Sequence, residues 1–149
     1  MRLAIYQPEI PGNLGAMLRL SACFGVAVDI IEPCGFAFSD KKMKRAGMDY
    51  IDHVVLTRHV DWDAFLAVQT VRVLLLSSKA TMRVHDFAFA SNDILLFGQE
   101  SAGVPDAVRD DCDAALRIPL GAHVRSLNVS VAAGIALGEA LRQTGQLPT

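Results

Sequence analysis

Residues 95–103 read LLFGQESAG, which indicates a buried strand that ends in a glycine-flanked loop with one carboxylate, Glu100. Two similar transitions follow. Residues 116–120, LRIPL, indicate a second short strand stopped by a proline, and residues 125–134, RSLNVSVAAG, indicate a polar turn that opens a helix of small residues. Open α/β sheets bind ligands at the carboxyl ends of their strands, where these polar and glycine positions fall. The last third of the chain is therefore predicted to carry the functional site.

Length and composition indicate a single folded domain over residues 1–149. With 149 residues, 52% of them hydrophobic, and a mean hydropathy of +0.32, the chain has enough apolar material for a substantial core. The apolar runs are too short to span a membrane and the first residues do not resemble a signal peptide, so we expect a cytoplasmic protein. The net charge of −2 requires any nucleic-acid surface to be a local patch.

The cysteines and histidines show no spacing typical of metal ligands. Cys23, Cys34 and Cys112 are odd in number and scattered, so we expect reduced thiols and no bound metal. The sequence also lacks G-x-G-x-x-G after a strand, G-x-x-x-x-G-K-[ST] and G-x-S-x-G. The usual dinucleotide, triphosphate and serine-hydrolase interpretations therefore have no motif to support them.

Hydrophobic periodicity predicts alternating strands and helices. Asn13 is the expected N-cap of a helix that ends at Phe24 and buries a face with Ala16 and Leu20, and Asp61 is expected to cap a later helix. The alternation predicts an α/β domain with a mostly parallel sheet and helices on both faces. The expected strands are 3–6, 26–31, 53–56, 71–76, 94–97 and 114–118, and the expected helices are 13–24, 40–46, 61–69 and 128–143, with a short one beginning at Pro105.

A single arginine, Arg19, and a run of cations at residues 40–45 are candidates for a functional role. Arg19 follows Asn13 by six residues, and it is either a surface residue or a group that folds back towards the loop at the start of its helix. Residues 40–45, DKKMKR, form either a solvated helix face or a patch that contacts phosphates. The cations of this run are Lys41, Lys42, Lys44 and Arg45.

The polar residues of the last third also allow two interpretations. Glu100 lies between Gly98 and Gly103, and glycine lets a backbone approach a ligand closely. Glu100 is therefore either a carboxylate that meets a ligand or a turn acid that caps the next helix. Ser126 and Asn128 are either helix N-caps or ligand contacts, and the two roles are compatible because a helix N-terminus presents free N–H groups.

Taken together, these segments resemble the SpoU branch of the SPOUT family of knotted RNA ribose methyltransferases. The family motif N-x-G-x-x-x-R matches residues 13–19, and G-x-E-x-x-G matches residues 98–103. The third motif, I-P followed by S-L-N-V-S, matches residues 118–119 and 126–130. All three occur in the family's order and cover nearly the whole chain. Residues 6–11, 31–36, 45–50 and 57–59 are similar to a compact subgroup that methylates the wobble nucleotide of tRNA.

The resemblance implies a C-terminal trefoil knot, S-adenosylmethionine as cofactor, and 2′-O-methylation of the ribose at position 34 of tRNA, with leucine tRNAs as the expected substrates. The arginine of the first motif, here Arg19, would remove the 2′-hydroxyl proton or stabilise the developing alkoxide. Glu100 and Asn128 would orient Arg19 and the ribose or cofactor. The cofactor contacts implied by the family are Leu76, Gly98, Ile118 and Ser126.

The resemblance also implies an assembly and a binding partner. Family members are homodimers whose active sites use both subunits, so Arg19 would act within its own subunit or across the interface. The expected partner is the anticodon stem-loop of tRNA, with no metal and no membrane. The alternatives are methylation of another tRNA or rRNA nucleotide and a catalytically idle RNA-binding module on the same fold.

Overall fold

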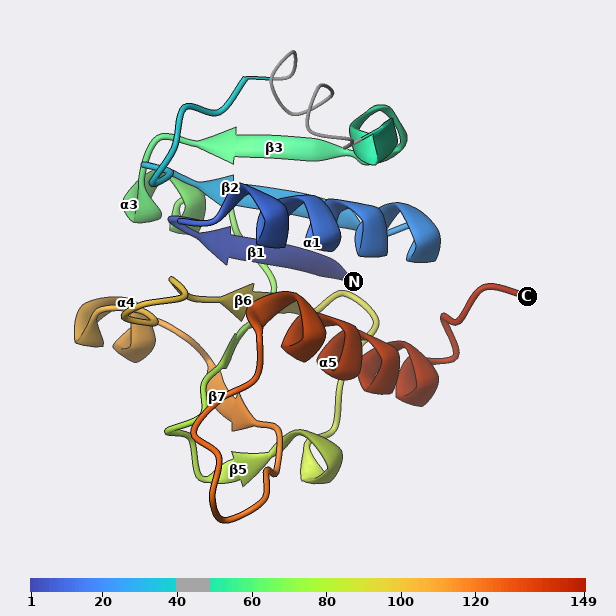
Figure 1. The fold of residues 1–149 in the computed structure, drawn as a ribbon. Coiled ribbons are helices and arrows are strands. Elements are labelled where there is room, and N and C mark those ends of the chain that lie inside the picture. The colour runs from blue at the N-terminus through green and yellow to red at the C-terminus, as the bar shows by residue number, and fades with distance from the viewer. Residues whose placement is uncertain (40–48) are drawn as a thin grey trace.

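The protein is an α/β domain built on a seven-stranded parallel sheet (Figure 1). The structure is a computed structural model that describes residues 1–39 and 49–149. The strands lie in the order β3-β2-β1-β6-β4-β7-β5, and each neighbouring pair is parallel, as predicted for most of the sheet. Their bounds are β1 (Arg2–Tyr6), β2 (Ala27–Ile31), β3 (Leu56–His59), β4 (Val73–Leu76), β5 (Met82–Arg83), β6 (Ile94–Phe97) and β7 (Ala114–Arg117).

Helices cover both faces of this sheet, which confirms that part of the predicted fold. On one face, α1 and α5 lie side by side and bury their apolar side chains against Leu3, Leu95 and Phe97. On the other face, α3 and α4 pack around Phe65 and Leu96. In the described part of the chain, no helix is both long and apolar enough to cross a membrane. The helices are α1 (Pro11–Phe24), α3 (Trp62–Leu66), α4 (Asp106–Asp110) and α5 (Val129–Thr144), with 3-10 turns η1 (Asp49–His53) and η2 (Val84–Asp86).

Helix α1 begins earlier than predicted. Its N-cap is Ile10, and Pro11 is its first residue. Proline fits the first turn of a helix because the N–H that it lacks would have no partner there. The prediction that Asn13 is the N-cap of this helix was therefore wrong.

The buried face of α1 also differs from the predicted one. Ala16 is exposed, and Leu20 and Phe24 are only partly buried. Leu20 lies towards α5, with its Cδ1 4.0 Å from where a Cβ on Gly134 would sit. Because α1 packs on the sheet and beside α5, its apolar residues cover a wide arc, and the pattern alone did not separate the two contacts. The residues that face the core are Leu14, Met17, Leu18 and Ser21.

Three further elements differ from the prediction. The third strand lies at 56–59 rather than at 53–56, because residues 49–53 form η1. Helix α3 ends at Leu66 rather than near residue 69. Strand β5 was not predicted, since two exposed residues at a sheet edge show no hydrophobic alternation. The N-cap role of Asp61, which accepts a hydrogen bond from the Ala64 N–H at 2.8 Å, and the bounds of β6 are confirmed. The helix predicted at 40–46 lies outside the described residues.

Candidate active site

The carboxyl ends of three neighbouring strands bring most of the predicted cofactor residues together. Strand β4 lies between β6 and β7, and Leu76 at its end is in register with Phe97 of β6 and Leu116 of β7. Gly98 directly follows β6, and Ile118 directly follows β7. Leu76, Gly98 and Ile118 therefore lie together at the carboxyl end of the sheet, and their role as cofactor contacts stays a prediction.

The loop that follows β6 is a tight turn that depends on its two glycines. The N–H groups of Gln99 and Gly103 donate to each other's carbonyl oxygens at 2.8 and 2.9 Å. A Cβ on Gly98 would lie 2.5 Å from the carbonyl carbon of Gly103, so no side chain fits there. Gly103 has a φ of +68°, which glycine adopts without steric cost. The turn presents Glu100 at its tip.

Glu100 fastens this turn to the start of α1. Its carboxylate accepts hydrogen bonds from the N–H groups of Glu9 (3.1 Å) and Ile10 (3.4 Å) and from Nδ2 of Asn13 (3.2 Å). In the opposite direction, the Glu9 carboxylate accepts from the hydroxyl (2.7 Å) and the N–H (2.9 Å) of Ser101. These bonds, led by that of the Ser101 hydroxyl, lower the pKa of the Glu9 carboxyl. We call these reciprocal bonds the Glu9–Glu100 clasp.

Asn128 joins the third motif to the other two. Its Oδ1 accepts hydrogen bonds from the N–H (2.9 Å) and hydroxyl (2.6 Å) of Ser130, which confirms its N-cap role at α5. Its Nδ2 donates to Oδ1 of Asn13 at 2.9 Å, and Asn13 in turn donates to Glu100. A chain of hydrogen bonds thus runs Asn128–Asn13–Glu100. Asn13 was not predicted as a site residue, although its place in the first motif was a signal for it.

Arg19 lies on the exposed side of α1, apart from this chain of hydrogen bonds. Its guanidinium carbon lies 4.9 Å from the centre of the Tyr50 ring, a geometry that favours a cation–π contact. Within residues 1–39 and 49–149, no hydrogen bond joins Arg19 to Glu100 or Asn128. The structure therefore connects Arg19 to the other two predicted catalytic residues only through α1, whose first turn they hold.

A cavity of about 240 Å³ lies beside the strand ends, and the segment after β7 forms most of its wall. Of the predicted cofactor residues, Ile118 lines the cavity, and Ser126 follows its last lining residue in an exposed stretch, 121–128. The lining residues are Ser78, Arg117, Ile118, Leu120, Gly121, Ala122, Val124 and Arg125.

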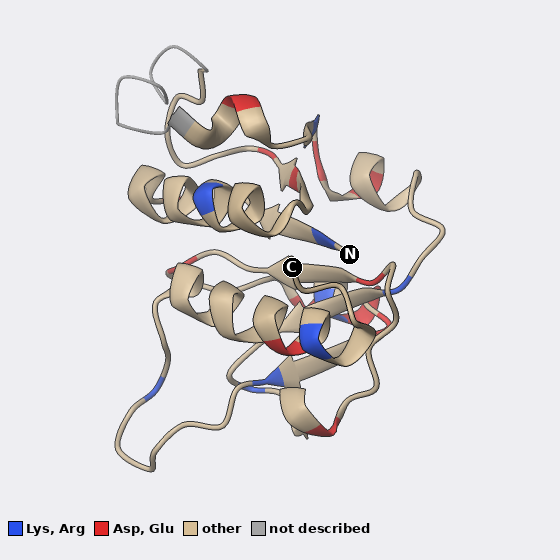
Figure 2. Ribbon diagram, turned by 90° about the vertical axis from the view of Figure 1, so that its right-hand side faces the viewer, with Lys and Arg blue, Asp and Glu red and all other residues tan. Residues whose placement is uncertain are grey.

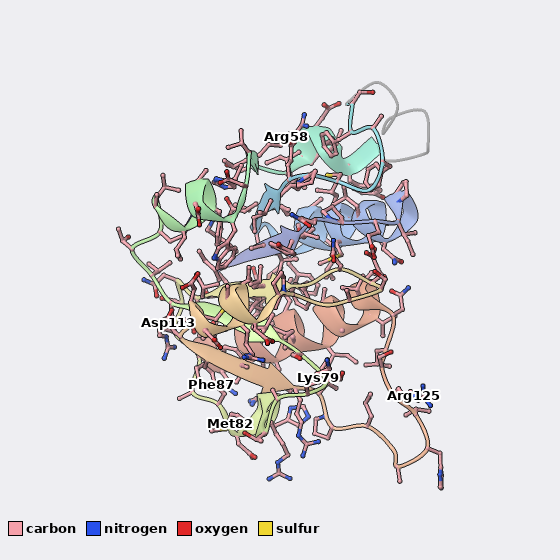
Figure 3. All side chains as sticks on the ribbon, turned by 90° about the vertical axis from the view of Figure 1, so that its left-hand side faces the viewer. Arg58, Lys79, Met82, Phe87, Asp113 and Arg125 are labelled. Atoms are coloured by element: carbon pink, nitrogen blue, oxygen red, sulfur yellow. The ribbon has the colours of Figure 1, made fainter. Side chains whose placement is uncertain are left out.

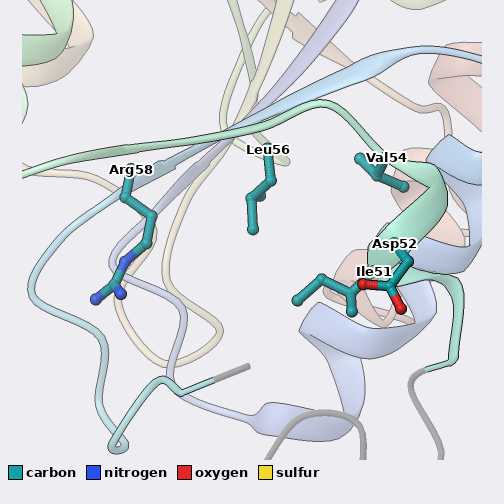
Figure 4. A pocket seen from close by; sticks show the side chains of 5 residues that line it. All are labelled: Ile51, Asp52, Val54, Leu56 and Arg58. Atoms are coloured by element: carbon teal, nitrogen blue, oxygen red, sulfur yellow. The ribbon is translucent and has the colours of Figure 1, made fainter. Parts of the chain in front are cut away.

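A larger cavity, of about 380 Å³, lies beside β3, which is the far edge of the sheet from β5 (Figure 4). Its Arg58 is already engaged, because it pairs with Glu32 and stacks 4.5 Å from the centre of the Phe38 ring. No residue of the three motifs lines this cavity, so we assign the candidate site to the strand ends instead. The lining residues are Ile51, Asp52, Val54, Leu56 and Arg58.

The predicted RNA contacts and the predicted absence of a metal are not tested by the geometry of this site. The predicted RNA contacts Lys41, Lys42, Lys44 and Arg45 lie outside the described residues. Among residues 1–39 and 49–149, no three His, Cys, Asp or Glu side chains gather in a way that could hold a metal ion. The absence of a metal requirement stays a prediction.

Comparison with known families matches residues 1–138 to the SpoU rRNA Methylase family. The chain belongs to the SpoU family. The match includes all three motifs whose side chains meet at the strand ends, so the predicted family is confirmed.

The relatives of this SpoU chain include enzymes that act on tRNA. It is 57% identical over 148 residues to the tRNA (cytidine(34)-2′-O)-methyltransferase of Beijerinckia indica subsp. indica, with 97% of this chain and 92% of the relative covered. A solved structure described as concerning the 2′-OH methylation of C/U34 on tRNA has a TM-score of 0.88 and 42% identity, with 95% of this chain and 89% of that chain covered. The SpoU methyltransferase AviRb from Streptomyces viridochromogenes, solved with AdoMet, has a TM-score of 0.83 and 25% identity, with 96% and 57% covered.

Proposed function

We propose that the protein acts in the cytoplasm and transfers a methyl group from S-adenosylmethionine to the ribose 2′-oxygen of nucleotide 34 in tRNA, with leucine tRNAs as its substrates. The observation that carries this proposal is the chain of hydrogen bonds Asn128–Asn13–Glu100, which joins the three family motifs beside the carboxyl ends of β1 and β6. The 57% identical relative named for cytidine 34 supports the choice of nucleotide.

The strand ends suit S-adenosylmethionine, and AviRb, which was solved with this cofactor, supports the assignment. The wall of the cavity is mainly polar, and the exposed residues 121–128 offer backbone hydrogen-bonding groups to a cofactor. When bound, the cofactor supplies an electrophilic methyl group on a sulfonium. The residues that we propose to hold it are Leu76, Gly98, Ile118 and Ser126.

The residues of the chain must position and activate the ribose hydroxyl. In-line transfer requires the 2′-oxygen about 3–3.5 Å from the carbon that it attacks. A guanidinium is a poor base at neutral pH, so Arg19 fits stabilisation of the developing alkoxide better than removal of the proton, which passes to solvent water as the methyl group is transferred. Glu100 and Asn128 orient Asn13 and thereby fix the first turn of the helix that carries Arg19.

We propose that two copies of the chain associate through α1 and α5. Val131 and Ile135 on α5 remain 50% and 39% exposed, although the opposite side of the helix is buried in the core. Exposed apolar residues on a two-helix layer suit a symmetric interface. In this dimer, Arg19 can act across the interface. Sedimentation at micromolar concentration is expected to show a dimer for the wild type and a monomer for Ile135→Lys, and a monomeric wild type would contradict the proposal.

We also propose that the C-terminal segment forms a trefoil knot. After β4, residues 77–93 reach the sheet edge through β5 before the chain returns to β6 in the middle of the sheet. After β7, residues 118–128 lead to α5, which packs back on β6 and α1 (Figure 1). The chain after β7 thus returns to the middle of the sheet past the earlier segment 77–93. This path supports a knot, which is a rare exception to the usual connections between strands.

The decisive experiment is incubation of the protein with total tRNA and methyl-labelled S-adenosylmethionine, followed by mapping of the labelled nucleoside. We expect 2′-O-methylation at position 34 of leucine tRNAs. Label at another nucleotide would overturn the proposed target. Binding of RNA and cofactor without any label would instead indicate an idle RNA-binding module.

A further inference from the structure

The cations around the smaller cavity differ from the other cations of the structure. Ten of the 14 Lys and Arg residues are described, since the four at positions 41–45 are not. Six of the ten pair with Asp or Glu, namely Arg2, Arg58, Arg72, Arg83, Arg109 and Arg142. Within the described part of the chain, the four without an acidic partner are Arg19, Lys79, Arg117 and Arg125. Arg117 and Arg125 line the cavity, and Lys79 follows its lining residue Ser78.

The two segments that form the cavity contain no acidic residue. Residues 64–85 and 114–138 lack Asp and Glu, although the chain has 16 acids against 14 cations. Figure 2 shows basic but no acidic residues along the loop that leads to α5, and Figure 3 places Lys79, Met82 and Arg125 at the same end of the molecule. A protein with a net charge of −2 thus presents a positive surface around this cavity.

The pairing of β5 with β7 adds a second, independent observation. Arg83 and Arg117 are register partners in this parallel pair, so two cations stand side by side on neighbouring strands. Like charges directly opposite each other destabilise a sheet. Asp86 neutralises Arg83 at 2.6 Å, whereas Arg117 donates only a long hydrogen bond, 3.4 Å, to the carbonyl of Thr81. A bound anion would relieve the repulsion at Arg117.

We propose that Lys79, Arg117 and Arg125 bind the phosphates of the RNA on either side of the ribose that enters the cavity. This inference rests on the proposed function, because it takes the cavity as the place of methyl transfer. It adds an RNA contact on the cofactor side of the sheet to the one predicted at residues 41–45. Lys and Arg neutralise backbone phosphates without reading the bases, so this surface fixes the position of the RNA rather than its sequence.

The charge of the cofactor argues that these cations serve the RNA. S-adenosylmethionine carries a sulfonium, which neighbouring cations repel. Its single carboxylate can pair with one of the three cations and leaves two unused. A polyanion with one charge on each nucleotide can engage all three, and it gains the release of counterions.

Salt-dependent RNA binding tests the proposal directly. Lys79→Gln/Arg125→Gln removes two exposed cations, and its affinity for an unmodified tRNA transcript is measured without cofactor at several salt concentrations. Each phosphate contact contributes about 0.7–0.9 to the slope of log affinity against log salt, so we expect the slope to fall by roughly 1.4–1.8 and the affinity by about tenfold in moderate salt. The matched control is Arg109→Gln/Arg142→Gln, which removes two exposed cations already paired with acids elsewhere.

The outcomes separate this inference from the proposed function. An equal slope for the wild type and both double variants would overturn the RNA surface. Weaker S-adenosylmethionine binding with an unchanged RNA slope would also overturn it and would assign the cations to the cofactor carboxylate. A reduced slope in Lys79→Gln/Arg125→Gln alone supports the surface, even where the wild type methylates no tRNA and the proposed function fails.

Discussion

Replacement of Glu100 by alanine tests whether this carboxylate acts on the fold or on the substrate. The change removes the acceptor for the N–H groups of Glu9 and Ile10 and for Nδ2 of Asn13, at 3.1, 3.4 and 3.2 Å. Hydrogen bonds to a charged group contribute about 1.5–3 kcal/mol each when short and shielded. These three are long and partly exposed, and water replaces some of them in the variant. We therefore expect a total loss of about 2 kcal/mol.

Thermal unfolding measures this loss. For a domain of this size, each kcal/mol lowers the melting temperature by about 2–4 °C, so Glu100→Ala should melt about 4–8 °C lower than the wild type. Glu100→Gln is the matched variant, because it keeps the size and one acceptor oxygen but turns an N–H₂ towards the donors. It should lose a smaller amount of stability. Methyl transfer should slow in parallel in both variants, since the first turn of α1 loses its fastening to the loop after β6.

One result would show that the Glu9–Glu100 clasp does not stabilise the fold. An unchanged melting temperature in Glu100→Ala, combined with a large loss of methyl transfer, would mean that the hydrogen bonds to α1 contribute little. Glu100 would then act on the ribose or the cofactor directly, as the family resemblance alone implied.

The remaining predictions concern single side chains. Arg19→Ala and Arg19→Lys should both slow single-turnover methyl transfer by roughly 10²–10⁴-fold with unchanged cofactor affinity, and near-normal rates would exclude the role. Gly98→Ala should lower the free energy of unfolding in urea by about 1–3 kcal/mol, because its Cβ would meet backbone at 2.5 Å; an unchanged midpoint would show that the loop adapts. Burial raises the pKa of the Cys112 thiol to about 12, so iodoacetamide near neutral pH should modify it far more slowly in the folded than in the urea-unfolded protein, and equal rates would contradict this. Arg142 and a neighbouring amide lower the pKa of Glu139 from 4.5 to about 2. This stabilisation is present above pH 4.5 and lost as the pH falls to about 2, so the stability difference between wild type and Glu139→Gln should shrink over that range. It should stay below about 1 kcal/mol because Arg142 is 64% exposed, and a constant difference would refute the assignment.

Structural features that depend on residues close together in the chain could be predicted from the sequence. The caps Asp61 and Asn128 and the strand at 94–97 follow from side chains that act on their own neighbours in the chain. The partners of Asn13 could not be predicted, because Glu100 and Asn128 reach it only when β1 and β6 pair and α5 packs on α1. For the same reason, the pattern of apolar residues in α1 did not show which of them face the sheet and which face α5. The place of Arg19 beside Tyr50 likewise depends on the tertiary fold.

The strand order has a consequence for synthesis of the protein on the ribosome. Arg2 at the start of β1 pairs with Ile94 of β6, and the core over both strands is completed by Ala133 and Leu137 of α5, near the end of the chain. The first strand therefore emerges long before its central partner and its cover. Until α5 is released, the nascent chain exposes apolar side chains that will line this face, and exposed apolar surface favours aggregation. The native core therefore closes only once α5 has left the ribosome, and a chain whose synthesis stalls within α5 cannot close it.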